Sequence, residues 1–259
     1  MDRDLHTALW NAWTACQLFA VRQLEQGEFT VGRIIAFAWE RHFKRPSDGE
    51  RYEAKYAAFR NELLAGTWSD TYDLIECALE AVDDTTLREL LVAAFNNALE
   101  RERAAYRIVA DQVTPITSEV AASAIQTAIE ETSKLGTVRA HLAAALELFS
   151  RRKDPDYRNS IKESISAVES LCKLLAKSPS ATLGDALDRL EKAGVSIHPA
   201  QKKAFSAIYG WTNDAQGIRH GLKDEVLPEQ EDALYMLEVC SAFVSYLLAK
   251  AARAGIKVQ

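Results

Sequence analysis

The sequence predicts an all-α protein of ten to twelve helices, with at most one small β-hairpin. Glycine and proline are sparse, at 11 and 6 of the 259 residues, so turns are few and the elements between them are long. Apolar residues recur at steps of three and four through nearly the whole chain, which is the pattern of one buried helix face. Only residues 106–116 look extended, and Pro115 excludes this stretch from the centre of a larger sheet.

The first half of the chain carries five helical patterns. An apolar stripe that includes Leu5, Leu9 and Trp13 predicts the first helix, and Gly27 ends it. The pattern Thr86-x-x-Glu89 is a capping box that predicts the start of the fifth helix. The five helices are predicted over residues 4–26, 30–43, 50–65, 69–82 and 86–105.

Residues 106–116 connect the two halves of the chain. A small hairpin that turns at Ala110–Gln112 and an irregular connection explain this stretch equally well. Both alternatives leave the fold class unchanged.

The second half continues the helical pattern. Gly136 is expected to end one helix, and His141 in the next is expected to be a hydrogen-bonded core or edge histidine. Residues 151–156 form a charged break with a proline, which is the best candidate domain boundary. It divides the chain into a domain of residues 1–152 and a domain of residues 153–259. Helices are predicted over residues 117–135, 138–149, 157–177, 183–193, from 199 onward and 228–255.

Two helices of the second domain have the cleanest apolar faces. In the helix of residues 157–177, Ile161, Ile165 and Val168 belong to one apolar stripe, and the helix of residues 228–255 has a similar stripe. Each face needs cover, so the two helices are expected to pack against each other.

Composition excludes several function classes. The formal net charge is −6 and the isoelectric point is near 5.5, which does not support a strongly basic nucleic-acid protein but leaves room for a local basic groove. The chain lacks a phosphate-binding glycine loop and the motifs of zinc proteases and serine hydrolases. Because the five histidines are scattered, neither a metal site nor a cofactor is expected.

The N-terminus and the cysteines indicate a soluble cytoplasmic protein. The first residues include acids and do not form a signal peptide, and no uninterrupted apolar run approaches 18 residues, so no membrane contact is expected. The four cysteines are far apart within helical patterns, which indicates buried thiols in a reducing compartment. They are Cys16, Cys77, Cys172 and Cys240.

The densest polar stretch is residues 209–221, in which Arg219 and His220 are adjacent and glycines flank them. A fixed cation beside a side chain that titrates near neutral pH is suited to handling a phosphate. A structural ion-pair cluster is the alternative. Arg219 is expected to have an acidic neighbour, with Glu169 as the first choice and Asp214 as the second.

Several stretches of the chain resemble bacterial AbiJ-type abortive-infection proteins. In the first half, the segments that carry the resemblance are residues 9–11, 68–76, 106–107 and 115–117. In the C-terminal third they are at residues 156–169, 182–187, 217–221 and 239–244. The C-terminal region is also similar to the HEPN superfamily, and this similarity implies a compact helical bundle, preceded by a helical N-terminal domain, that is usually a homodimer.

The HEPN resemblance implies a metal-independent endoribonuclease in which an arginine holds the phosphate and histidines act on the ribose 2′-OH. Arg219 and His220 fit the first two motif positions as catalytic residues. The second histidine would fall at residues 224–226, which are Asp, Glu and Val. Three alternatives therefore stay open: His220 serves as the base, the domain binds RNA or a nucleotide without cutting it, or the domain is a dimerisation domain.

The expected function is an antiphage or toxin-like effector that acts on RNA. The competing function is a non-catalytic binding protein with a protein or nucleotide partner. An antitoxin or a regulatory protein stays open as a further partner. Binding roles are expected for Glu169, Asn213, Asp214 and Lys223.

Overall fold

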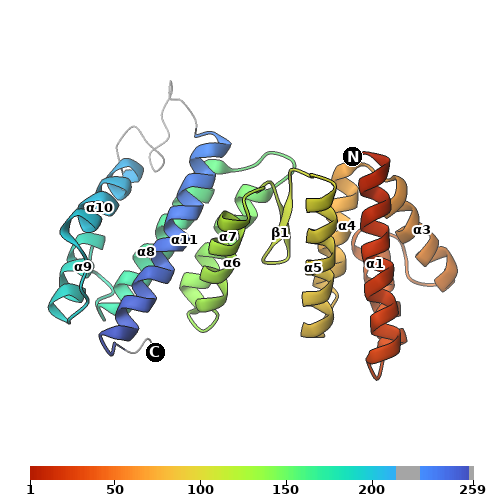
Figure 1. The fold of residues 1–259 in the computed structure, drawn as a ribbon, viewed down its shortest axis with the longest axis horizontal. Coiled ribbons are helices and arrows are strands. Elements are labelled where there is room, and N and C mark those ends of the chain that lie inside the picture. The colour runs from red at the N-terminus through yellow and green to blue at the C-terminus, as the bar shows by residue number, and fades with distance from the viewer. Residues whose placement is uncertain (214–227, 257–259) are drawn as a thin grey trace. The chain divides into compact units, whose positions relative to one another are not determined.

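The computed structural model of the chain describes residues 1–213 and 228–256. Within these residues it has eleven helices and one two-stranded sheet, which confirms the predicted all-α fold with at most one small hairpin. Of the two alternatives for residues 106–116, the structure has the hairpin. The chain divides into two compact units, Met1–Thr117 and Ser118–Gln259. Figure 1 shows both units and labels most of their elements.

The first unit is a set of helices around α1, closed by the hairpin. Helix α1 packs against α2, α3 and α5. The rings of Trp13 and Phe59, each 1% exposed, lie 4.6 Å apart between centroids at the centre of this core. The elements are α1 (Arg3–Gln23), α2 (Gly27–Arg41), α3 (Tyr52–Ala65), α4 (Trp68–Glu80), α5 (Thr85–Arg101), β1 (Arg107–Val109) and β2 (Gln112–Thr114).

The start of α5 corrects one detail of the sequence analysis. The cap is Asp84, whose carboxylate accepts a hydrogen bond of 2.7 Å from the Leu87 amide. The helix therefore begins ahead of Thr86, and the pattern Thr86-x-x-Glu89 lies inside its first turns. Aspartate and threonine are both good N-cap residues. Asp84 is the N-cap here because its backbone is in the extended conformation just before the helix.

The hairpin is held by its turn and by two side chains of the surrounding helices. Ala110 and Asp111 form a two-residue turn with φ of 47° and 66°, and positive φ at both positions is the signature of a type I′ turn. Asn96 of α5 accepts from the Ile108 amide at 2.7 Å and donates to the Ile108 carbonyl at 3.0 Å. Glu76 of α4 accepts from the Val113 amide at 2.6 Å. Both edges of the small sheet are thus hydrogen-bonded.

The second unit is a helical bundle. Helix α8 packs against α7 and α11, and α11 also packs against α6 and α7 (Figure 1). The predicted packing of the two cleanest helices against each other is confirmed. The elements are α6 (Glu119–Glu131), α7 (Gly136–Ser150), α8 (Tyr157–Leu175), α9 (Leu183–Lys192), α10 (Pro199–Asn213) and α11 (Gln230–Arg253).

The role of one glycine in the second unit differs from expectation. Gly136 begins α7 instead of ending the helix before it, because α6 already ends at Glu131 and a short turn follows. The predicted domain boundary at residues 152–153 stays a prediction; it lies between α7 and α8, which pack against each other within one compact unit. The division into compact units comes earlier, after Thr117.

Helix α11 is long and apolar enough to cross a membrane by length and composition alone. Its apolar face is covered in this structure, since Leu237, Cys240, Val244 and Leu247 are 0% exposed. The contacts of α11 with α6, α7 and α8 therefore account for its apolar composition, as in the core helix of a bundle.

Candidate functional site

The predicted site residues belong to the second unit, and Glu169 is the one whose side chain the structure describes. Asn213 is the last residue of α10. The remaining four lie between α10 and α11, outside the described residues: Asp214, Arg219, His220 and Lys223. The grouping of these six residues into one site stays a prediction.

Glu169 lies on α8 with a side chain that is 17% exposed. Its carboxylate is 3.8 Å from the ammonium group of Lys173, one helical turn further along. A pair at this distance and exposure is worth well under about 1 kcal/mol. Burial raises the pKa of the neighbouring Cys172 thiol to about 12, and the nearby Glu169 carboxylate makes a smaller contribution in the same direction. Its expected role as a partner of Arg219 stays a prediction.

A polar contact that sequence reasoning did not pair joins α7 to α8. Nδ1 of His141 lies 2.6 Å from Oε2 of Glu163, and the two side chains are 30% and 25% exposed. His141 is thus a hydrogen-bonded edge histidine, as expected. Nearby, the Ser160 hydroxyl donates to the Ala145 carbonyl at 2.8 Å.

The His141–Glu163 pair has acid–base capability. When Nδ1–H donates to the carboxylate, Nε2 is the nitrogen that carries the lone pair in the neutral ring. His141 follows Thr137 by one helical turn, roughly 6 Å along α7, and Thr137 lines a pocket. The pair therefore joins α7 to α8 close to a cavity.

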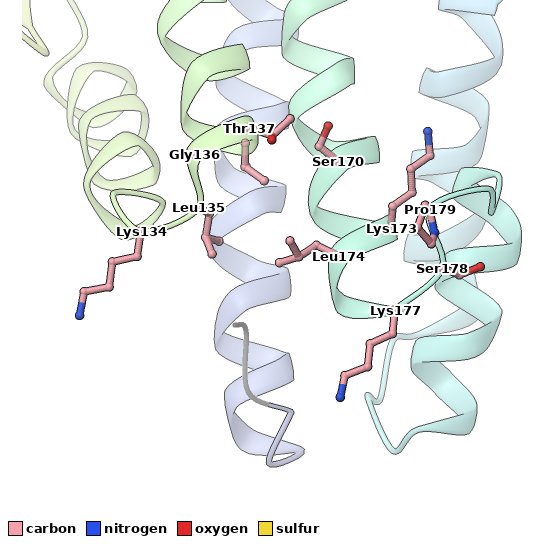
Figure 2. Close-up of a pocket in the computed structure, with 11 residues that line it drawn as sticks. Lys134, Leu135, Gly136, Thr137, Ser170, Lys173, Leu174, Lys177, Ser178 and Pro179 are labelled. Carbon is pink, nitrogen blue, oxygen red and sulfur yellow. The ribbon is translucent and has the colours of Figure 1, made fainter.

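That pocket has a volume of about 700 Å³ and lies between the start of α7 and the end of α8 (Figure 2). Three of its lining residues are lysines: Lys134, Lys173 and Lys177. A second pocket of about 520 Å³ shares Lys177 and adds Arg189. The lining of these two pockets thus places three lysines and one arginine at this end of the bundle.

The sequence contained only part of the signal for these lysines. In the predicted helix of residues 157–177, Lys173 and Lys177 are four residues apart and would share a face. In the structure α8 ends at Leu175, and Lys177 follows the end of the helix. Lys134 comes from the turn between α6 and α7, nearly forty residues earlier in the chain. Only the packing of α7 against α8 brings it to the same pocket, so periodicity could not have found the group.

Two segments of the first unit that resemble AbiJ proteins, residues 68–76 and residues 106–107, also contact each other. The ring of Tyr106 lies 5.8 Å from Trp68 and 5.0 Å from Tyr72 between centroids. Glu76, from the same segment as Trp68 and Tyr72, accepts a hydrogen bond from the Val113 amide of the hairpin. These residues fix the hairpin against α4, which is a structural role.

No group of three or more His, Cys, Asp or Glu side chains among the described residues could hold a metal ion. The expected independence from metal stays a prediction.

Comparison with known proteins identifies a family for the first half of the chain. The model of the family described as AbiJ N-terminal domain 4 matches residues 1–131, which extend through the first unit and α6. Neither the curated proteins nor the solved structures contain a match. The matched residues make up half of the chain, so the chain belongs to the AbiJ N-terminal domain 4 family and is an abortive-infection-related protein.

Proposed function

We propose that this abortive-infection-related chain acts on RNA through its C-terminal unit, with Arg219 and His220 as the residues that contact the RNA. The observation that carries the proposal is the glycine-flanked Arg–His pair of residues 217–221, which resembles the HEPN motif and connects α10 to α11 in an AbiJ-type chain. Arg219 binds a phosphate through its guanidinium group. His220 exchanges a proton with the ribose 2′-OH.

A non-catalytic variant of this function has an observation in its favour. Residues 224–226, where HEPN ribonucleases would have a second histidine, are Asp, Glu and Val. A single imidazole per subunit must then act both as base and as acid, unless a second subunit supplies the other. RNA binding with weak or absent cleavage is the form of the proposal that agrees best with this sequence.

The same resemblance leads us to propose a two-fold homodimer through the C-terminal unit, in the cytoplasm, with the two Arg–His pairs facing one cleft. Light scattering at micromolar concentration is expected to give twice the 28.8 kDa chain mass. A particle of one chain mass would contradict this proposal.

The test compares two matched double variants. Arg219→Ala with His220→Ala removes the proposed site, while Arg41→Ala with His42→Ala removes the adjacent Arg–His pair at the end of α2. On induced expression, wild type and the α2 variant are expected to slow growth, and the Arg219/His220 variant is expected to be harmless.

Binding and cleavage of RNA by the purified proteins, measured in EDTA, separate the two forms of the proposal. Loss of RNA binding in the Arg219/His220 variant at an unchanged melting temperature would support it. A sharp fall in melting temperature would identify a structural pair, because breaking a buried ion pair costs roughly 3–5 kcal/mol. Cleavage that disappears in EDTA would exclude the HEPN mechanism.

A further inference from the structure

The pocket between α7 and α8 has a composition that points to an anionic ligand. Its polar lining consists of three lysines and three hydroxyl residues, and none of the lining residues is acidic. The polar lining residues are Lys134, Thr137, Ser170, Lys173, Lys177 and Ser178. The chain as a whole has a net charge of −6. The lining of this pocket therefore has the opposite sign of charge from the chain as a whole.

One of the three lysines has an acidic neighbour, and the other two have none among the described residues. Lys173 has the 3.8 Å contact with Glu169. Among the described residues, no carboxylate lies within ion-pair distance of Lys134 or Lys177. Figure 2 shows the three ammonium groups pointing in different directions around the pocket. Each is on a flexible four-carbon stem, so they can rotate towards a shared anion.

Backbone amides, and not the Lys177 ammonium group, close the end of α8. The carbonyl of Lys173 already accepts a hydrogen bond from the Ser178 amide at 3.0 Å, and the carbonyl of Leu174 accepts from the Lys177 amide at 3.1 Å. This is the backbone closure of a Schellman motif, which most often has glycine where Lys177 stands. Lys177 has φ of 49°, a conformation that costs a residue with a side chain roughly 1 kcal/mol.

The start of α7 adds to the positive potential of the pocket. Its N-cap, Leu135, provides no side-chain hydrogen bond. The next residues, Gly136, Thr137 and Val138, line the pocket, and the amides of a first helical turn have no partner within the helix. The positive end of the helix dipole therefore acts in the same direction as the three lysines.

The rest of the lining limits the class of ligand. The volume of about 700 Å³ is that of a small-molecule site. Leu135, Val138, Leu174 and Pro179 offer apolar cover for a sugar or a base, but none of the lining residues is aromatic. Base stacking is therefore not available in this pocket, and recognition depends on phosphate groups.

We propose that this pocket binds a small ligand with several phosphate groups, either a nucleoside triphosphate or an inorganic polyphosphate. The proposal is independent of RNA binding at Arg219 and His220. Ligand affinity is set by the number of phosphates and falls with rising salt.

Calorimetry of the full chain with three probes tests the ligand class. ATP and tripolyphosphate are expected to bind with similar affinity, and AMP is expected to bind about tenfold or more weakly, because it carries fewer charges. ATP binding without tripolyphosphate binding would identify a base-reading site and overturn the proposal. Absence of binding by both ATP and tripolyphosphate at millimolar concentration would also overturn it.

Three variants locate the site. Lys177→Gly removes a cation and relieves the positive φ, so it is expected to weaken ATP binding roughly five- to tenfold while the melting temperature holds or rises. Lys134→Gln is expected to weaken binding similarly from the other side of the pocket. Lys162→Gln, an exposed lysine earlier on α8 and outside the pocket, is the matched control and is expected to bind as wild type does.

Equal binding by wild type and by both pocket variants would place the ligand elsewhere and overturn the proposal. So would an equal loss in the Lys162 variant, which would indicate a nonspecific charge effect. The Arg219→Ala His220→Ala variant is expected to retain ATP binding. A short RNA that binds only through the pocket lysines, with no binding of the small probes, would instead make the pocket an RNA contact and also contradict the proposal.

Discussion

The four thiols occupy environments that suppress their reactivity. Burial is the main cause that raises the pKa of each, to about 11 for Cys77 and to about 12 for Cys172, and the pKa of Cys16 and Cys240 is also raised. The thiolate is the reactive form, so a raised pKa lowers the reactive fraction at neutral pH. Cys77 is the only one of the four that is not buried.

We expect native protein at about pH 8 to react slowly with iodoacetamide, at Cys77 first. The rate at Cys77 is expected to rise as pH approaches 11, because its thiol ionises only there. Mass spectrometry of native and urea-unfolded protein measures both rates, and all four thiols should react in urea. Modification of Cys172 as fast as Cys77 in the native protein would contradict the burial of α8.

At the level of single residues, the sequence predicts a contact when its two partners lie close together in the chain. The capping box of Thr182 and Asp185 joins residues three positions apart, so its cause is local. The role of His198 at the start of α10, where its Nδ1 accepts from the Ala200 amide at 3.2 Å, is also local. The contact of His141 with Glu163 joins residues 22 apart, and their pairing became visible only in the fold.

At the scale of elements, the hairpin shows where sequence reasoning reaches its limit. Its turn residues are Ala110 and Asp111, whereas a type I′ turn prefers Asn and Gly. The residues that fix its edges, Asn96 and Glu76, lie 12 and 37 positions from their partners. A hairpin and an irregular connection were therefore indistinguishable from the sequence. The helices, by contrast, follow directly from their periodic apolar faces.

Asn96 gives a direct test of how the hairpin is held. Asn96→Ala removes both hydrogen bonds to Ile108, which is 4% exposed, and leaves a buried amide and carbonyl without this partner. We expect destabilisation of about 1–3 kcal/mol in urea unfolding. Asn97→Ala, one position along α5 and exposed, is the control and is expected to have little effect. Equal stability of the two variants would show that the hairpin does not depend on Asn96.

For the whole molecule, each compact unit has its own apolar core. Every residue of the core cluster of the first unit lies between Leu5 and Val113. In the second unit, Leu142, Leu146 and Phe149 of α7 are at most 1% exposed, and α7 packs against α6, α8 and α11. The charge and proline content of residues 151–156 marked a loop correctly, but a loop between packed helices has the same composition as a linker between domains.

Experiments on fragments can distinguish the division after Thr117 from the predicted boundary at residues 152–153. A fragment of residues 1–117 keeps the whole core cluster of the first unit, so we expect it to be soluble and to unfold in one cooperative transition. A fragment of residues 1–152 adds α6 and α7 but lacks the α8 and α11 that cover them. We expect it to bind a hydrophobic dye or to aggregate, since it exposes contiguous apolar surface.

The complementary fragments sharpen the test, because residues 118–259 retain the α7–α8 contact and residues 153–259 lose it. Circular dichroism and thermal unfolding are expected to show a cooperative transition for residues 118–259 and a weaker or absent one for residues 153–259. If residues 1–152 and 153–259 both unfolded cooperatively and stayed soluble, the boundary at the charged break would be correct. In that case the contact of α7 with α8 would be an interface between domains instead of part of one core.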